Sequence, residues 1–323
     1  MAALTQPLDS SSSTAQLGLN HIVAEEIRME LAEKLNVWQL GVVPLVGDFA
    51  GAGTTTIRVT HVGGIGWDAK MVSMPTETSA PTMANPTAGY SSVTLGRFGL
   101  GFSETFQNRL VSQPNVRASM GGEAFRAQAA NTWFATFRER VCVTGATITP
   151  SVGSAATTLS VDNLIALATA FNTADGAEDG GAPVVMLDPQ QIEEAKASAR
   201  SEPAFQGDLA GFTSVQGVAG RIYDNFLGLG MTVVGTGDTQ QSGGAFQGFA
   251  FQRGGIGYGV ASTSPLQLGP GSNPVYVDEY GLVVYDVNNG LNQQTAQTNA
   301  IAFMGFALGS SDVYFQRRVL STT

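Results

Sequence analysis

The chain has little of the chemistry on which most enzymes and disulfide-bonded proteins depend. Its 323 residues include one cysteine and two histidines, and charged residues make up 13% of the total. A single cysteine excludes an internal disulfide framework and fits a reducing compartment. The charged share is about half of the usual 25% or so, so the solvated surface of a monomer would be short of charge. We therefore expect partners to cover much of the surface.

Basic residues are scarce and scattered along the chain. The formal net charge is −10, the isoelectric point is about 4.6, and Arg317-Arg318 is the longest basic run. Tight binding to nucleic-acid phosphates needs clustered Lys and Arg, so we predict no strong or specific DNA binding. None of the lysines follows a glycine, which excludes a Gly-Lys-Ser/Thr phosphate loop.

Candidate metal ligands and catalytic groups are isolated. His21 and His61 have no Cys or His at ligand spacing, and the acidic loop of Asp175, Glu178 and Asp179 lacks the regular spacing of a calcium site. There is no Gly-x-Ser-x-Gly elbow, and Cys142 has apolar neighbours that predict an inert buried thiol. We therefore predict no catalytic residues, no metal and no cofactor.

The densest glycine cluster, residues 254–259, neither matches the dinucleotide pattern Gly-x-Gly-x-x-Gly nor opens a helix, so we predict a turn or a close-packed strand there. The N-terminus lacks the cationic and apolar regions of a signal peptide. The longest apolar stretch, residues 300–308, is far short of the roughly 20 residues of a membrane span. We expect a soluble chain that is not exported by a signal peptide and does not enter a membrane.

The N-terminal region begins as a small, polar arm over residues 1–16, which we predict to be mobile. Helical periodicity follows, and its apolar positions are Ile22, Val23, Ile27, Leu31, Leu35 and Trp38. Gly41 and Pro44 then end the segment. This helix has one apolar stripe and must pack on something.

An extended excursion comes next. Residues 54–62 and 91–102 have strand composition, and the segment between them is broken by Pro75, Pro81 and Pro86. Residues 71–89 carry Glu77 as their single charge and few large apolar groups, so they cannot form a core of their own. We predict a hairpin-like ribbon whose loop is stabilised by a neighbouring copy of the chain.

The strongest helix of the chain follows this excursion. Its apolar side chains recur at four-residue steps: Phe125, Ala129, Trp133, Phe137 and Val141. A start near Pro114 gives about 28 residues and roughly 40 Å. Gly121 and Gly122 interrupt it at a cost of about 1 kcal/mol each relative to Ala. The helix therefore begins after this pair or bends there, which makes the two glycines a candidate hinge.

The remaining sequence mixes helix and strand signals without a repeat, which is typical of an α+β fold. Ser160 caps a helix through residue 170, and Asp188 with Pro189 opens another through residue 199. Strands are predicted at residues 184–187, 230–234, 246–252, 256–261, 275–277, 282–287, 299–308 and 313–320. We expect the C-terminal strands to pack on the long helix.

This order of parts resembles the major capsid proteins of tailed bacteriophages (Caudoviricetes-like), whose Hong Kong 97-like fold encapsulins share. The long helix ends in Phe134-Ala-Thr-Phe-Arg-Glu-Arg-Val141, the central region contains Pro183-Val-Val-Met-Leu-Asp-Pro189, and a sheet-forming tail follows. The resemblance implies an N-terminal arm and helix (1–52), an extended loop (53–103), a peripheral domain with the spine helix (104–145 and 275–323) and an apical domain (146–274).

The resemblance also implies a function. Copies would form pentamers and hexamers that close into an icosahedral virion shell around double-stranded DNA, assembled in the host cytoplasm with a scaffolding protein, a portal and cement or decoration proteins. The candidate inter-subunit loop contains Lys70, Pro75, Glu77, Pro81 and Pro86. Some relatives join a loop lysine covalently to an asparagine. Here Lys70 is either an ordinary solvated lysine or the donor to Asn288, Asn289 or Asn292.

Three alternatives stay open. An encapsulin-like shell would enclose protein cargo instead of DNA. A surface or adhesin-like β-rich protein fits the low charge and the abundant Gly, Ser and Thr, although the strong helices and the absence of a signal peptide oppose it. A soluble α+β enzyme is favoured by the central region alone, which supplies no catalytic constellation.

Overall fold

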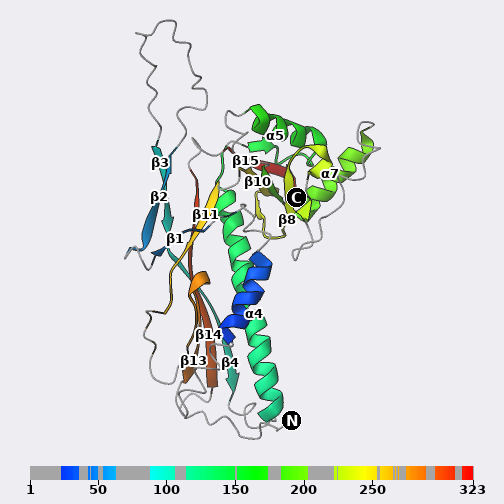
Figure 1. Cartoon of the computed structure of the whole chain (residues 1–323). Coiled ribbons are helices and arrows are strands. Elements are labelled where there is room, and N and C mark those ends of the chain that lie inside the picture. The colour runs from blue at the N-terminus through cyan, green and yellow to red at the C-terminus, as the bar shows by residue number, and fades with distance from the viewer. Residues whose placement is uncertain are drawn as a thin grey trace, which may run out of the picture.

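The structure is a computed structural model of the whole chain. It describes residues 23–35, 43, 45–49, 54–62, 88–105, 114–149, 151–173, 183–202, 222–223, 225–252, 255–264, 266, 268, 274–288, 295–309 and 315–322. A long helix, α4, lies along a sheet of long strands, and a second unit of sheet and helices lies beside the C-terminal end of α4 (Figure 1). The described chain is therefore an α+β fold, as predicted.

Helix α4 spans Pro114–Gly145 and is the long helix predicted from the sequence. It begins at Pro114, and its 32 residues are helical through Gly121 and Gly122, so the predicted alternative of a start after the glycine pair is wrong. The two glycines lower helix propensity by only about 1 kcal/mol each. No helix in the described part of the chain is long and apolar enough to cross a membrane.

One sheet has six strands and is built around the longest strand, β14 (Thr295–Leu308). On one side β14 pairs with β4 (Gly96–Thr105); on the other it pairs with β13 (Leu282–Asn288) and β11 (Ile256–Val260). The sheet is completed by β12 (Val275–Val277), which pairs with β13, and by β1 (Leu45–Asp48), which pairs in parallel with β11.

The other large sheet has seven strands, which are β5 (Ser151–Gly153), β6 (Val184–Leu187), β7 (Ile222–Tyr223), β8 (Thr232–Gly235), β9 (Gln240–Ser242), β10 (Ala245–Phe251) and β15 (Gln316–Thr322). Its two faces belong to two apolar clusters. Met186 and Phe249 pack in the cluster that contains the α4 stripe, whereas Val185 and Ala250 pack with α5 (Val161–Thr173) and α7 (Pro189–Ser201). The sheet therefore lies between α4 and the helix pair.

Both helices of this unit begin where the sequence predicts. The Asp188 side chain accepts a hydrogen bond from the Gln190 backbone N–H, and the Asp188 backbone N–H donates one to Gln191 Oε1 at 3.1 Å, which completes a capping box for α7. Ser160 Oγ accepts a hydrogen bond from the Asn163 backbone N–H at 3.4 Å at the start of α5.

The strand pairing corrects three details of the sequence prediction. The predicted strand over residues 91–102 is two strands, β3 (Ala88–Thr94) and β4. They are separated at Leu95, whose backbone N–H donates a hydrogen bond to the Thr55 carbonyl at 2.9 Å. The sequence places β11 in the apical domain, but this strand pairs with β14 in the six-stranded sheet. The sequence places β15 in the peripheral domain, but this strand pairs with β10 and β5 in the seven-stranded sheet. These partners are distant in sequence, so the local pattern did not show them. The four-part domain division itself stays a prediction.

Residues 23–35 form the predicted N-terminal helix, and its stripe is buried as expected. Ile27, Leu31 and Leu35 are fully buried in the cluster that contains α4. Two polar contacts at the edge fix its position: Lys34 Nζ donates to Asn131 Oδ1 of α4, and Arg28 Nε lies 2.9 Å from Glu279 Oε2.

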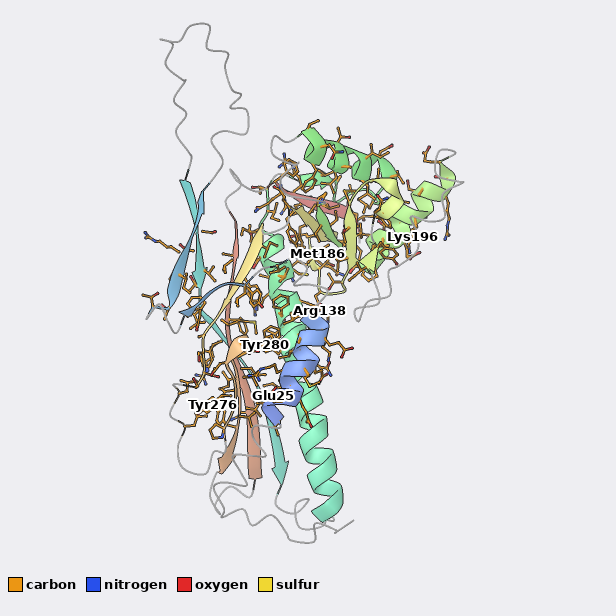
Figure 2. All side chains as sticks on the ribbon, in the orientation of Figure 1. Glu25, Arg138, Met186, Lys196, Tyr276 and Tyr280 are labelled. Carbon is orange, nitrogen blue, oxygen red and sulfur yellow. The ribbon has the colours of Figure 1, made fainter. Side chains whose placement is uncertain are left out.

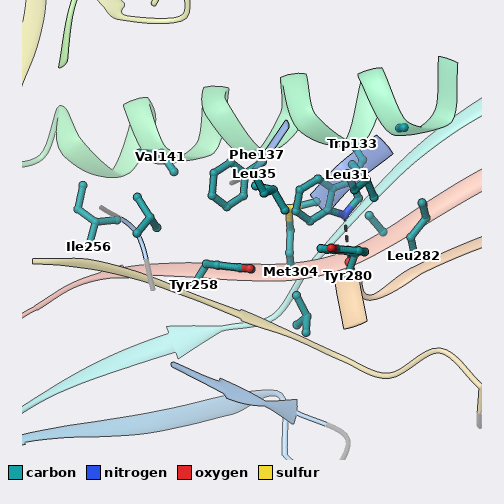
Figure 3. Packing of buried hydrophobic residues seen from close by; sticks show 14 of the residues in the cluster. Leu31, Leu35, Trp133, Phe137, Val141, Ile256, Tyr258, Tyr280, Leu282 and Met304 are labelled. Atoms are coloured by element: carbon teal, nitrogen blue, oxygen red, sulfur yellow. Dashed lines mark hydrogen bonds between the residues drawn. The ribbon is translucent and has the colours of Figure 1, made fainter. Parts of the chain in front are cut away.

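Aromatic rings form the centre of the α4 cluster (Figure 3). Phe137 stacks on Trp133 at 5.4 Å between centroids and meets the edges of Tyr258 and Phe306 at 5.1 and 5.5 Å. Trp133 Nε1 donates a hydrogen bond to the Tyr280 carbonyl at 3.0 Å. One buried cluster thus joins α4 to β11, β14 and the turn before β13.

We predict that Phe137→Ala lowers the free energy of unfolding of the chain by about 3–5 kcal/mol, because it opens a cavity among rings that cannot collapse into it. Urea unfolding followed by circular dichroism measures this change. Met29→Ala is the control, since Met29 lies on the N-terminal helix and is 71% exposed; it should change stability by less than about 0.5 kcal/mol. Equal effects of the two substitutions would contradict the assignment of the core.

Candidate assembly surfaces

The residues of the predicted inter-subunit loop lie outside the described part of the chain. They are Lys70, Pro75, Glu77, Pro81 and Pro86, and Asn289 and Asn292 lie outside it as well. Asn288 ends the backbone of β13, while its side chain is outside the described part. The predicted roles of these residues stay predictions.

The two arms of the predicted excursion are present as an antiparallel ribbon. Strand β2 (Thr56–Val62) pairs with β3 (Ala88–Thr94) over seven residue pairs, from Thr56 opposite Thr94 to Val62 opposite Ala88. Figure 1 shows the ribbon extending past the six-stranded sheet. Val93 anchors its base and is 1% exposed, whereas Thr56, Ser92 and Thr94 are exposed.

The base of the ribbon lies against β14 through a close backbone contact. A Cβ added at Gly305 would lie 2.4 Å from the Thr94 carbonyl oxygen and 3.0 Å from Val93 Cγ1. Glycine is therefore required at residue 305 for β3 to lie this close to the sheet. The ribbon is attached at one end and projects at the other.

A groove of about 310 Å³ lies between α4 and β4. Its apolar floor includes Phe98, Trp133 and Leu282, and its polar rim is formed by Arg97, Thr132, Thr136, Glu139 and Arg140. The Arg140 guanidinium lies over the Phe98 ring, 4.8 Å from its centroid, and 4.0 Å from Glu139 Oε1. The groove thus combines an apolar floor with two arginines, and it opens on the surface.

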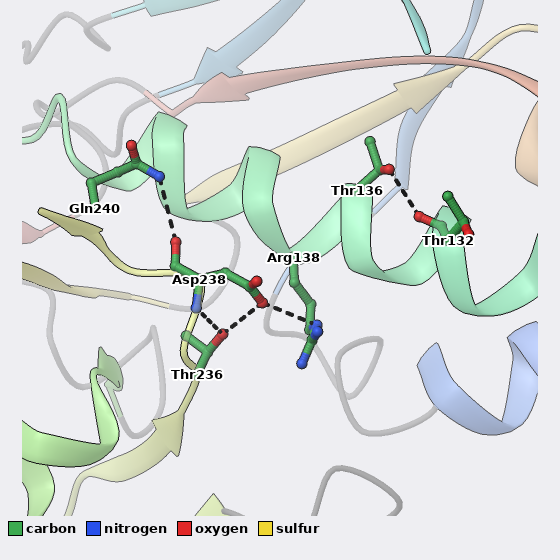
Figure 4. Close-up of polar contacts among 6 residues, drawn as sticks. All are labelled: Thr132, Thr136, Arg138, Thr236, Asp238 and Gln240. Atoms are coloured by element: carbon green, nitrogen blue, oxygen red, sulfur yellow. Dashed lines mark hydrogen bonds and ion pairs between the residues drawn. The ribbon is translucent and has the colours of Figure 1, made fainter. Parts of the chain in front are cut away.

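A polar joint connects α4 to the seven-stranded sheet (Figure 4). Arg138 Nε lies 3.2 Å from Asp238 Oδ2, and the same carboxylate oxygen accepts a hydrogen bond from Thr236 Oγ1 at 3.0 Å. The Asp238 carbonyl accepts one from Gln240 Nε2 at 3.4 Å. The joint holds the turn between β8 and β9 against the helix.

Cys142 lies beside this joint. It is fully buried, as the sequence predicts. Burial, with a smaller contribution from the Asp238 charge, raises the pKa of the thiol to about 12. The thiol therefore stays protonated at physiological pH.

Other predicted sites give no ligand geometry. Within the described residues no group of three His, Cys, Asp or Glu side chains is placed to hold a metal ion. His21 and the acidic loop of Asp175, Glu178 and Asp179 lie outside these residues, as does the side chain of His61.

The glycine cluster is a close-packed strand, one of the two alternatives predicted for it. A Cβ at Gly257 would lie 2.6 Å from Val46 Cγ1, and one at Gly259 would lie 2.8 Å from Phe49 Cε2. Because Gly257 and Gly259 have no side chains, β1 can pair closely with β11 in the sheet.

No protein-family model and no curated protein matches the sequence. Solved structures do match the fold. The chain is similar to the capsid protein of cyanophage P-SCSP1u at 11% identity, with a TM-score of 0.51. It is also similar to the protein of the mature capsid of bacteriophage PhiM1 at 9% identity, again with a TM-score of 0.51. Each match covers 87% of this chain and 86% of the matched chain. The acid-stable capsid of Helicobacter pylori bacteriophage KHP30 matches at 10% identity over 84% and 85%, with a TM-score of 0.50.

The chain has the Hong Kong 97-like capsid fold. This confirms the fold that the sequence resemblance implied. The β2–β3 ribbon and the groove beside β4 are the candidate functional surfaces of this fold. The groove was missed at the sequence level, because Arg97 and Arg140 become neighbours only through the packing of β4 against α4.

We predict that Cys142 in the folded chain does not react with a thiol reagent at pH 8, because the side chain is buried and the pKa of about 12 leaves almost no thiolate. In denaturant one thiol per chain should react at once. Absorbance after addition of a disulfide reagent measures both rates. Rapid reaction of the folded chain would contradict this prediction and show that α4 and the seven-stranded sheet separate readily at the Arg138–Asp238 joint.

Proposed function

We propose that this chain is a major capsid protein, the structural subunit of an icosahedral bacteriophage head, and that it has no enzymatic role. The observation that carries the proposal is the match of fold over more than four-fifths of the chain to solved phage capsids. A fold alone does not define a function, so the surfaces of the subunit must support the proposal.

Two physical features support it. The ribbon of β2 and β3 projects from the sheet, and Val93 is the one buried side chain among its described side chains. A two-stranded ribbon is marginal by itself, so its ordering is offset best by contacts with another subunit. The low share of charged residues, 13%, fits a chain whose surface is largely interface.

The proposed assembly consists of pentamers and hexamers in a virion shell formed in the host cytoplasm. A scaffolding protein, a portal and decoration proteins are its proposed partners, and the shell encloses double-stranded DNA. Because the chain carries a net charge of −10 and no basic cluster, it faces that DNA without binding it tightly. The proposed domain division is an arm (1–52), an extended loop (53–103), a peripheral domain (104–145 and 275–323) and an apical domain (146–274).

The loop between β2 and β3 is proposed to hold subunits together, with Lys70, Pro75, Glu77, Pro81 and Pro86 as its contact residues. Negative-stain microscopy of the purified chain, with scaffolding protein supplied where needed, should show closed particles. A variant that replaces residues 75–86 by a short Gly-Ser link should keep its circular dichroism and unfolding midpoint but fail to close, because the loop contacts are lost while the described core is intact.

Several outcomes separate the alternatives. A stable monomer of the intact chain under these conditions would contradict the capsid proposal. Normal closed particles from the shortened variant would contradict the role of the loop alone. Particles that enclose protein instead of DNA would favour the encapsulin-like alternative, and submicromolar DNA binding by free subunits in a filter assay would contradict the proposed loose contact with DNA.

Gly121 and Gly122 are proposed as a hinge that lets α4 change curvature when a precursor shell matures. Because both residues are helical here, the double substitution to Ala should stabilise the straight helix by about 1–2 kcal/mol. Expansion of precursor particles, followed by light scattering, should then be slower. Gln128→Ala, at an exposed position of the same helix, is the control. Unchanged expansion kinetics in the double variant would contradict the hinge.

A further inference from the structure

Strand β4 is an edge strand with one row of backbone groups directed outward, and the register shows which residues carry them. The Phe303 N–H donates to the Gly281 carbonyl at 2.8 Å, and the Phe303 carbonyl accepts from the Ala261 N–H at 3.1 Å. Phe303 therefore faces away from β4. Its neighbours Met304 and Ala302 face β4, since successive residues of a strand point their backbone groups to opposite sides.

Met304 lies opposite Gly96 and Ala302 lies opposite Phe98, so the even-numbered residues of β4 bond to β14. The backbone N–H and C=O groups of the odd-numbered residues point outward: Arg97, Gly99, Gly101, Ser103 and Thr105. Among the described residues, β14 is the only strand that pairs with β4. The outward groups thus form a continuous template for another strand.

This edge has little of the usual protection against pairing, because Arg97 and Glu104 are its only charged residues. The ten residues of β4, Gly-Arg-Phe-Gly-Leu-Gly-Phe-Ser-Glu-Thr, contain neither proline nor lysine, and their register with β14 runs from Gly96 to Thr105 without a bulge. Proteins that remain monomeric usually shorten such an edge or place Lys, Pro or a bulge on it. The other edge strands of the two large sheets, β1, β5, β7, β9 and β12, have at most four residues each. Among the described strands of the two large sheets, β4 is therefore the one long edge strand.

The residues around the outer edge of β4 leave access for the extended backbone of another strand. Gly99 and Gly101 expose their backbone without a covering side chain, and Leu100 is 36% exposed. The groove between α4 and β4 runs beside the same residues, with Arg97 and Arg140 on its rim. A chain with net charge −10 offers carboxylates to these two arginines.

We infer that an extended segment of a second copy of this chain adds to the outer edge of β4 as an extra strand, with side chains seated in the groove beside Arg97 and Arg140. The inference rests on the proposed function, which supplies the second copy. Main-chain hydrogen bonds provide the affinity, and the groove selects the side chains, as in other cases of strand addition.

The test compares two substitutions of Gly99, whose N–H points outward. Gly99→Pro removes that donor and places a ring on the edge, while the β4–β14 bonds remain. Gly99→Ala is the matched control, because an added Cβ would meet the Ala300 carbonyl oxygen and Ile301 Cγ1 at ordinary contact distances of 3.6 Å. Particle yield should fall about tenfold or more in the Pro variant, which leaves a partner carbonyl unpaired in the interface, and stay unchanged in the Ala variant.

Amide hydrogen exchange makes the test independent of folding defects. In free subunits the amides of Gly99 and Gly101 should exchange rapidly and those of Phe98 and Leu100 slowly; in particles all four should be protected. Outward amides that stay unprotected in normal particles would overturn this inference and leave the capsid function intact. Protection already in free subunits would also overturn it, since the chain's own residues would then cover the edge. Failure of the wild-type chain to form particles would overturn both.

Discussion

The apolar stripe of α4 packs against both large sheets at once, and the rest of the subunit depends on this contact. Phe137 and Trp133 face Tyr258 and Tyr280 beside the six-stranded sheet. The same cluster continues to Met186 on the seven-stranded sheet, and Figure 2 labels Met186 there and Tyr280 beside the six-stranded sheet. Because a single core spans the helix and both sheets, neither sheet can move off α4 without exposing large apolar side chains.

Close backbone packing and a few polar contacts complete this arrangement. A Cβ at Gly145, the last residue of α4, would lie 2.4 Å from Phe249 Cδ2, so the helix ends directly on β10. The ion pair between Arg138 and Asp238 fixes the turn beside it. Because the two side chains are 32% and 27% exposed, the pair fixes position more than it adds stability. The consequence is one packed core from which the β2–β3 ribbon projects and along one edge of which β4 lies.

Local signals in the sequence predicted the elements well. The four-residue period of Trp133, Phe137 and Val141 identified the spine helix, and Asp188 with Pro189 identified the start of α7, because periodicity and capping act over a few residues. Pairing between distant strands could not be predicted in the same way. Strand β11 joins the six-stranded sheet and β15 joins the seven-stranded sheet because each pairs with a strand that is distant in sequence.

The candidate surfaces were predicted only in part, for the same reason. The ribbon could be predicted from strand composition on both sides of a proline-rich segment. The groove and the open edge of β4 could not, because Arg140 reaches Phe98 only after α4 has packed on the sheet. Gly99 carries no signal in the sequence; its outward N–H follows from the register with β14.

A cryo-electron microscopy reconstruction of the assembled chain would show whether the core of α4 and both sheets presents the β2–β3 ribbon and the β4 edge to other copies. We expect a closed icosahedral particle in which α4 and both sheets keep their packing and the β2–β3 ribbon rests on a neighbouring copy. Isolated subunits, or particles whose ribbons and β4 edges contact only solvent, would contradict it.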